Sequence, residues 1–257
     1  MAKRTSYAPG TPCWVDVSTP DTRTAVEFYG GLFGWEAEID PRPEAGGYGM
    51  FKLNGALVAG VGLQMNPGPP FWAVWVSVAD LEKTVELATT NGAKVVAGPM
   101  DVLDSGRAAV IQDSLGTYIS IWQPQAHMGA ELVNEPGSFA WNELATPDLP
   151  QSTEFYTSVF GWGTAEGQQG GNAVVFTVDG NMVCGAHAAG EGEQPAWSVW
   201  FSVEDCDRSA ATVEKLGGKV IVPPSEMGFG RGSVVADPQG AVFGIGAAST
   251  AGPASGQ

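Results

Sequence analysis

The pattern of apolar and polar positions near the N-terminus predicts a strand followed by a helix. Alternation along residues 14–17 puts Trp14 and Asp16 on one face and two valines on the other, as in a strand with one lined and one packed face. Apolar residues then recur at helical spacing, Asp21 is placed to cap the helix, and Gly34 is placed to end it.

The same pattern occurs again 127 residues later. Residues 14–35 read WVDVSTPDTRTAVEFYGGLFGW and residues 141–162 read WNELATPDLPQSTEFYTSVFGW, with 10 of 22 positions identical, including the aromatic landmarks. Asp148 and Gly161 repeat the predicted start and end of the helix. The chain is therefore a tandem duplication.

Each half continues with a second round of strand, helix and strands. Asn54-Gly55 predicts a hairpin after the first helix, and Asp80 and Gly92 bound a second helix. The predicted strands of the first half are 14–17, 36–39, 48–53, 56–64, 72–78, 94–96, 108–112 and 117–122. The sequence predicts an α+β fold of four βαβββ modules, two in each half.

Turn residues and loss of periodicity predict the domain boundaries. Residues 1–10 are expected to be a loose N-terminus and 124–138 a linker rich in Pro and Gly. The expected domains are 11–123 and 139–248, and 249–257 is expected to be a disordered tail.

Composition and charge narrow the classes of partner. The formal charge of −16 repels phosphate backbones and anionic lipid headgroups, so we expect neither nucleic acid nor a membrane as partner. Three cysteines without a CxxC pair indicate neither a disulfide framework nor a zinc knot. No apolar run is long enough to span a membrane. We expect a cytoplasmic protein, either a monomer acting as a fused pseudo-dimer or a homodimer.

The order of these elements resembles the vicinal oxygen chelate superfamily, which includes glyoxalase I, bleomycin-resistance proteins and extradiol dioxygenases. The resemblance rests on the Phe28-Tyr29 pair closing the first helix, the second capped helix, and the Asp113 to Gly116 turn, and it covers nearly the whole chain. The PCW and WNEL segments at 12–14 and 141–144 look closest to a two-domain actinobacterial glyoxalase-like branch labelled hydroxylase. The resemblance implies curved, cup-like sheets whose concave faces hold a metal or a ligand.

The resemblance also implies where metal ligands would lie, and the residues there are unsuitable. The corresponding positions hold Trp14, Ala73 and Ser120 in the first half and Trp141, Ser198 and Gly244 in the second. None of these binds a divalent cation well. The chain has only two histidines. We therefore expect no metal site and no cofactor.

Strand alternation anchored on these positions predicts what faces each cup. The cups are expected to combine indole walls, hydroxyls and one carboxylate each, a composition typical of a pocket for an apolar or aromatic small molecule. The predicted lining is Trp14, Asp16, Ala73, Trp75, Ser77, Tyr118, Ser120 and Trp122 in the first half, and Trp141, Glu143, Ser198, Trp200 and Ser202 in the second. Which modules share a cup stays open.

Asp16 and Glu143 occupy equivalent positions, two residues beyond the vacated ligand. A carboxylate among indoles has its pKa raised by desolvation, so either residue is a candidate general acid or base, and His187 is a candidate proton shuttle. The alternative is structural: each carboxylate accepts a hydrogen bond and shapes the pocket wall.

The sequence thus predicts a metal-independent protein that binds, or acts as an enzyme on, a flat apolar or aromatic compound. Tailoring of a natural product and sequestration of a drug both fit, so the expected setting is antibiotic biosynthesis or resistance. The alternative is a metal-dependent glyoxalase, lyase or dioxygenase with atypical ligands.

Overall fold

The structure is a computed structural model, and it describes residues 3–165, 171–228 and 230–248. The tail expected at 249–257 lies outside the described residues.

The first half forms one eight-stranded sheet in the order β2-β3-β4-β1-β5-β8-β7-β6. Its elements are β1 (Pro12–Thr19), α1 (Thr22–Phe33), β2 (Glu36–Ile39), a short 3-10 turn (Pro43–Ala45), β3 (Gly49–Leu53), β4 (Ala56–Leu63), β5 (Phe71–Ser77), α2 (Leu81–Thr90), β6 (Lys94–Val102), β7 (Gly106–Gln112) and β8 (Tyr118–Pro124).

The second half repeats this sheet in the order β10-β11-β12-β9-β13-β16-β15-β14. Its elements are β9 (Phe139–Thr146), α3 (Leu149–Phe160), β10 (Gly163–Thr164), β11 (Ala173–Val178), β12 (Asn181–Ala188), β13 (Ala196–Ser202), α4 (Cys206–Lys215), β14 (Lys219–Met227), β15 (Gly230–Ala236) and β16 (Val242–Ala248). The predicted α+β fold of four modules is confirmed.

The helix boundaries form for the predicted local reasons. Asp21 and Asp148 are extended residues whose carboxylates accept from the backbone N–H groups of Arg23 and Gln151. Gly34 and Gly161 end the two helices in the left-handed conformation, with φ of 73° and 69°. A residue with a Cβ is strained there, so glycine is the terminator.

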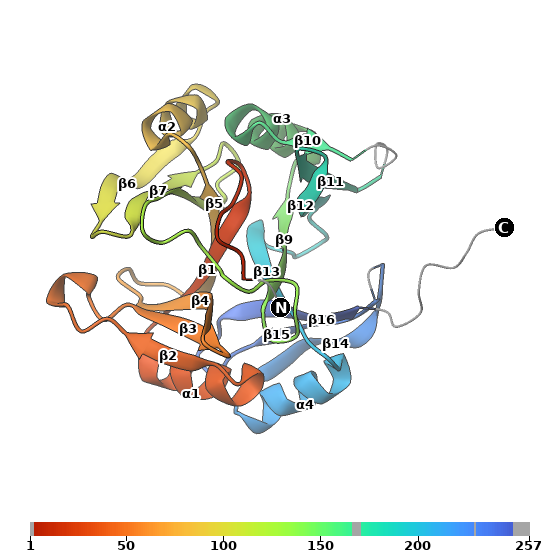
Figure 1. The fold of residues 1–257 in the computed structure, drawn as a ribbon. Coiled ribbons are helices and arrows are strands. Elements are labelled where there is room, and N and C mark those ends of the chain that lie inside the picture. Colours follow the sequence, from red (N-terminus) through yellow and green to blue (C-terminus); the bar gives the residue numbers. More distant parts are fainter. Residues whose placement is uncertain (1–2, 166–170, 229, 249–257) are drawn as a thin grey trace.

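The structure answers which modules share a sheet. β1 pairs antiparallel with β5, so the two modules of the same half lie side by side. The face of each sheet that carries the valines of β1, or their equivalents, belongs to one continuous apolar core shared by both halves. Figure 1 shows α1 beside α4 and α2 beside α3, at opposite ends of the molecule. We call the other faces, turned away from this core, the first cup (β1–β8) and the second cup (β9–β16).

Reciprocal hydrogen bonds lock the halves together across the core. The Tyr29 hydroxyl donates to Asp237 (3.1 Å), and the Tyr156 hydroxyl donates to Asp113 (2.8 Å). Each tyrosine is the second residue of a Phe-Tyr pair, and each aspartate opens the Asp-x-x-Gly turn of the other half. The recurring motif therefore has a role that neither half fulfils alone.

Residues of the N-terminal segment form hydrogen bonds with both halves. Gly10 N–H donates to Ser77 O, and Gly10 O accepts from the Trp162 indole at 2.6 Å. Gly137 in the linker does the same with Ser202 and Trp35. Both glycines have positive φ, 88° and 82°, and both follow a proline. The duplicated unit therefore begins upstream of the strand. Residues 1–2 lie outside the described part.

Candidate functional site

The predicted lining of the first cup does share one face of the sheet. Trp14 lies opposite Trp75 across β1 and β5, and Trp75 lies beside Ser120 on β8. Ala73 is opposite Asp16 and half-buried. The most enclosed members are Trp14, Ser77, Ser120 and Trp122, whereas Tyr118 is 57% exposed.

The linker fills the first cup. The His127 ring meets Trp14 edge-on at 4.5 Å between ring centroids, and the Trp122 indole donates to His127 O at 2.9 Å. Ala130, which is 1% exposed, donates its N–H to Cys13 O at the start of β1. The chain's own linker thus packs against Trp14 and Trp122, part of the face where a ligand was expected.

Asp16 is half-buried on the same face of the sheet. Tyr48 donates its hydroxyl to Asp16 Oδ2 (3.0 Å) and accepts from the Trp14 indole (2.9 Å). Burial raises the pKa of Asp16 to about 6, and the Trp75 and Tyr48 donors oppose that rise. The Trp75 N–H lies near the Asp16 carboxylate and favours its charged form, although it forms no hydrogen bond with any described residue. Burial likewise lowers the pKa of His127 to about 4.

The second cup is more accessible. Trp141 and Trp200 lie opposite one another across β9 and β13, and both are half-buried, as are Glu143, Ser198 and Ser202. The Trp141 indole donates to Glu143 Oε2 (2.7 Å), and the Trp200 indole donates to Ser198 Oγ (3.2 Å). The Trp200 ring lies directly on Gly244, where an added Cβ would come within 2.1 Å of it. Gly244, at a position where the family resemblance places a metal ligand, therefore leaves the space that the Trp200 indole occupies.

Glu143 and His187 form a pair at the wall of the second cup. His187 Nδ1 lies 3.3 Å from Glu143 Oε1, and His187 Nε2 lies 3.1 Å from Glu193 Oε1. The side chains of Glu143 and His187 keep 25% and 34% of their surface exposed. The Gly190 N–H, and then His187, lower the pKa of Glu193. An imidazole that is oriented by a carboxylate and lies near solvent can pass a proton between the two.

The two cups place different polar rings beside their carboxylates. In the first cup the Tyr48 ring covers Gly60 and Gly62, where an added Cβ would meet it. In the second cup His187 stands at the position that corresponds to Gly62, opposite the small Ala173. The ring thus comes from the residue before β3 in the first cup and from β12 in the second. In both cups it reaches the carboxylate, Asp16 or Glu143. The sequence analysis did not predict the contacts of Tyr48, of Glu193 or of the linker with the cups, because a predicted strand or linker does not show which distant residues its side chains reach.

The residues at the inherited metal positions do not fit a divalent cation. Trp14 and Trp141 donate their only N–H to Tyr48 and Glu143 and have no lone pair to offer. Across the described ranges, no group of three or more His, Cys, Asp or Glu side chains is arranged to hold a metal ion. Both nitrogens of His187 face carboxylates instead.

Comparison with known proteins identifies the family. Residues 13–121 and 133–245 match the model of the Glyoxalase/Bleomycin resistance protein/Dioxygenase superfamily, and the chain belongs to this family. The described helices include none long and apolar enough to cross a bilayer.

Full-length relatives and solved structures extend this match. The chain is 38% identical over 255 residues to the putative glyoxylase CFP32 of Mycobacterium tuberculosis, covering 95% of this chain and 97% of the relative. It is 35% identical over 259 residues to the anthracycline biosynthesis protein DauV of a Streptomyces species, covering 94% of each. A Mn(II)-bound glyoxalase from Novosphingobium aromaticivorans shares the fold with a TM-score of 0.67 at 15% identity, covering 96% of this chain and 83% of that one. The 2,3-dioxygenase LapB from a Pseudomonas species does so with 0.66 at 13%, covering 96% and 95%.

Proposed function

We propose that the second cup binds one flat, largely apolar small molecule against the Trp141 and Trp200 indoles, without a metal ion. The observation that carries this proposal is the contrast between the cups: these two indoles are half-buried and face one another across the strands, whereas the first cup is covered by residues of the linker. Indole faces stack favourably on planar rings, and the neighbouring hydroxyl and carboxylate can orient polar substituents.

Relatives support a fused-ring aromatic ligand. The proteins of two Streptomyces strains that are 35% and 34% identical to this chain are named for anthracycline biosynthesis. An anthracycline is a flat compound of fused rings, and such rings can stack on the half-buried Trp141 and Trp200 indoles. We therefore place the protein in the formation or handling of an aromatic natural product.

A second function, acid–base catalysis on the bound ligand, is favoured by the Glu143–His187 pair. Glu143 lies on β9, two residues beyond Trp141 and opposite Ser198 of β13, and it is hydrogen-bonded by Trp141 and His187. In this role Glu143 transfers a proton to or from the ligand, and His187 orients it and passes the proton towards solvent. Without turnover, the same cup acts as a sequestering site.

The test is a titration of the purified protein with a hydroxylated anthraquinone. Quenching of tryptophan fluorescence reports binding, and mass spectrometry of the mixture reports product. Binding and any turnover should persist in excess chelator, and the protein should carry no stoichiometric metal. Stoichiometric metal together with loss of activity on chelation contradicts the proposal and points to a metal-dependent glyoxalase or dioxygenase.

A further inference from the structure

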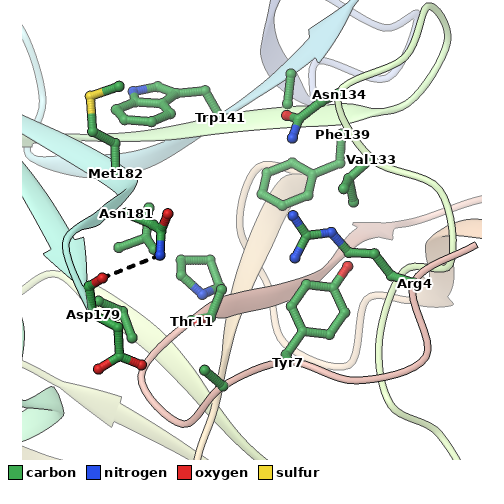
Figure 2. A pocket seen from close by; sticks show the side chains of 15 residues that line it. Arg4, Tyr7, Thr11, Val133, Asn134, Phe139, Trp141, Asp179, Asn181 and Met182 are labelled. Atoms are coloured by element: carbon green, nitrogen blue, oxygen red, sulfur yellow. Dashed lines mark hydrogen bonds between the residues drawn. The ribbon is translucent and has the colours of Figure 1, made fainter. Parts of the chain in front are cut away.

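A pocket of about 610 Å³ lies between the N-terminal segment, the start of β9 and the β11–β12 hairpin, and it shares Trp141 but not Trp200 with the second cup. Its size is in the range of small-molecule sites. Figure 2 shows the Arg4 guanidinium pointing into it from one wall and Asn181 and Met182 on the other side, with Phe139 and Trp141 above. The fold family's inherited ligand positions do not include Arg4, Asn181 or Met182.

The first half shows what occupies the equivalent place there. The backbone N–H of Leu57, at the start of β4, donates to Glu131 Oε2 at 3.0 Å. Lys3 Nζ donates to the same oxygen at 2.9 Å, and Glu131 N–H donates back to Leu57 O. The Leu57 N–H, followed by Lys3, lowers the pKa of Glu131. A carboxylate is thus held by one strand N–H and one cation.

The second half repeats the donors of this arrangement without the carboxylate. Met182 pairs with Thr177 after the same register shift by which Leu57 pairs with Lys52, and Met182 lines the pocket. Arg4 supplies a cation, and within the described residues it forms no ion pair; its guanidinium lies over the Tyr7 ring at 5.3 Å. The position equivalent to Glu131 is Arg4 itself, counting back 127 residues.

We infer that this pocket binds an aromatic carboxylate. The ligand carboxylate takes the part that Glu131 plays in the first half, with Arg4, the Met182 N–H and the second N–H of the Asn181 amide as donors; the first amide N–H already donates to Asp179 O at 3.3 Å. The ring packs on the apolar wall of Phe139 and Trp141. Asp179, on the exposed hairpin turn, also lines the pocket and opposes an anion, as does the net charge of −16. Carboxylate binding therefore depends on Arg4. This inference does not rest on the proposed function of the second cup.

The test compares naphthalene-2-carboxylate with its neutral carboxamide by isothermal titration calorimetry on the full chain. The carboxylate should bind once per chain, and the carboxamide at least tenfold more weakly. Arg4→Gln should weaken carboxylate binding about ten- to a hundredfold and leave the carboxamide unchanged, because a charge-assisted hydrogen bond is lost. Arg4 is exposed, so the variant should keep the wild-type melting temperature.

Arg23→Gln is the matched control. Arg23 is an exposed arginine on α1, paired with Glu27, and its loss changes the net charge by the same amount. Three results would overturn the inference. They are equal affinities in the Arg4 and Arg23 variants, equal binding of the carboxylate and the carboxamide, and no binding at concentrations on the order of millimolar. Trp200→Ala should leave carboxylate binding intact. If it abolishes that binding, the carboxylate occupies the second cup, and the inference again fails. A failure of anthraquinone binding leaves this test unaffected.

Discussion

The first and second cups have the same strands in the same order, and they differ in what covers them. In the first cup, His127 and Ala130 of the linker pack against Trp14 and Trp122, and Asp16 accepts a hydrogen bond from Tyr48. In the second cup, Trp141, Trp200 and Glu143 remain half-buried. Gly246 stands on β16 where Trp122 stands on β8, opposite Ser202 and Ser77 respectively. The duplication thus kept the same scaffold twice, but the linker packs on the indoles of one copy only, and we propose that the other copy binds the ligand.

The largest difference between the cups is expected in catalysis. Glu143→Gln should lower turnover of an accepted substrate about 100- to 10,000-fold, the usual contribution of a general acid or base, with ligand affinity retained. Asp16→Asn, the matched change in the first cup, should leave turnover unchanged. Steady-state rates of both variants check this, and equal losses in the two would show that the cups do not differ in function.

The next effect concerns affinity for the aromatic ligand. Trp200→Ala should weaken binding about ten- to a hundredfold, because base-like rings stacked on aromatic side chains gain about 1–3 kcal/mol. Trp75→Ala, its counterpart opposite Trp14, should change affinity less than twofold. Fluorescence titration measures both, with thermal melts as the control for folding. A stronger effect from Trp75 would reverse the assignment of the two cups.

The raised pKa of Asp16 in the first cup should make the free energy of unfolding depend on pH. The pKa of Asp16 is raised to about 6 by burial, so between about pH 4 and 6 the folded protein holds a proton that the unfolded chain has lost. This contribution to stability therefore falls as pH rises through that window. Asp16→Asn removes it, and the variant should gain roughly 2–3 kcal/mol over wild type at pH 7 and almost nothing below pH 4. Urea unfolding at several pH values measures the difference. A difference that does not change with pH would mean that Asp16 is solvated.

The smallest predicted effect concerns the tyrosine–aspartate hydrogen bonds, which are the same in both halves. Tyr29→Phe and Tyr156→Phe should each cost about 1–2 kcal/mol of unfolding free energy, because each leaves a buried aspartate of the other half without its tyrosine partner. The two losses should be similar, and unfolding should stay a single transition because the core is shared. Two separate transitions in chemical denaturation would show that the halves fold independently.

Much of the fold could be predicted because local rules agree with the tertiary structure. The Asp caps at Asp21 and Asp148 and the Gly34 and Gly161 ends are confirmed, as is the predicted order of modules. β6 is longer than the predicted 94–96, since it continues through register shifts near Pro99 that periodicity does not reveal.

The covering of the cups could not be predicted from the same rules. Strand alternation placed Trp14 and Trp141 on equivalent faces, but exposure depends on the path of the linker, which has no repeating pattern. The Tyr29–Asp237 hydrogen bond could not be predicted either, because its partners are 208 residues apart. In the sequence, Tyr29 reads only as a helix residue and Asp237 only as a turn residue. The acid–base and ligand-binding roles of Glu143 and His187 stay predictions.

The number of aromatic ligands bound per chain tests the central claim most directly. Calorimetric titration with a hydroxylated anthraquinone should give one site per chain, which Trp200→Ala weakens and Trp75→Ala preserves. Two equivalent sites per chain, or one site that depends on Trp75 and not on Trp200, would contradict the proposal that the ligand binds in the second cup and not in the first, where the linker packs on the indoles.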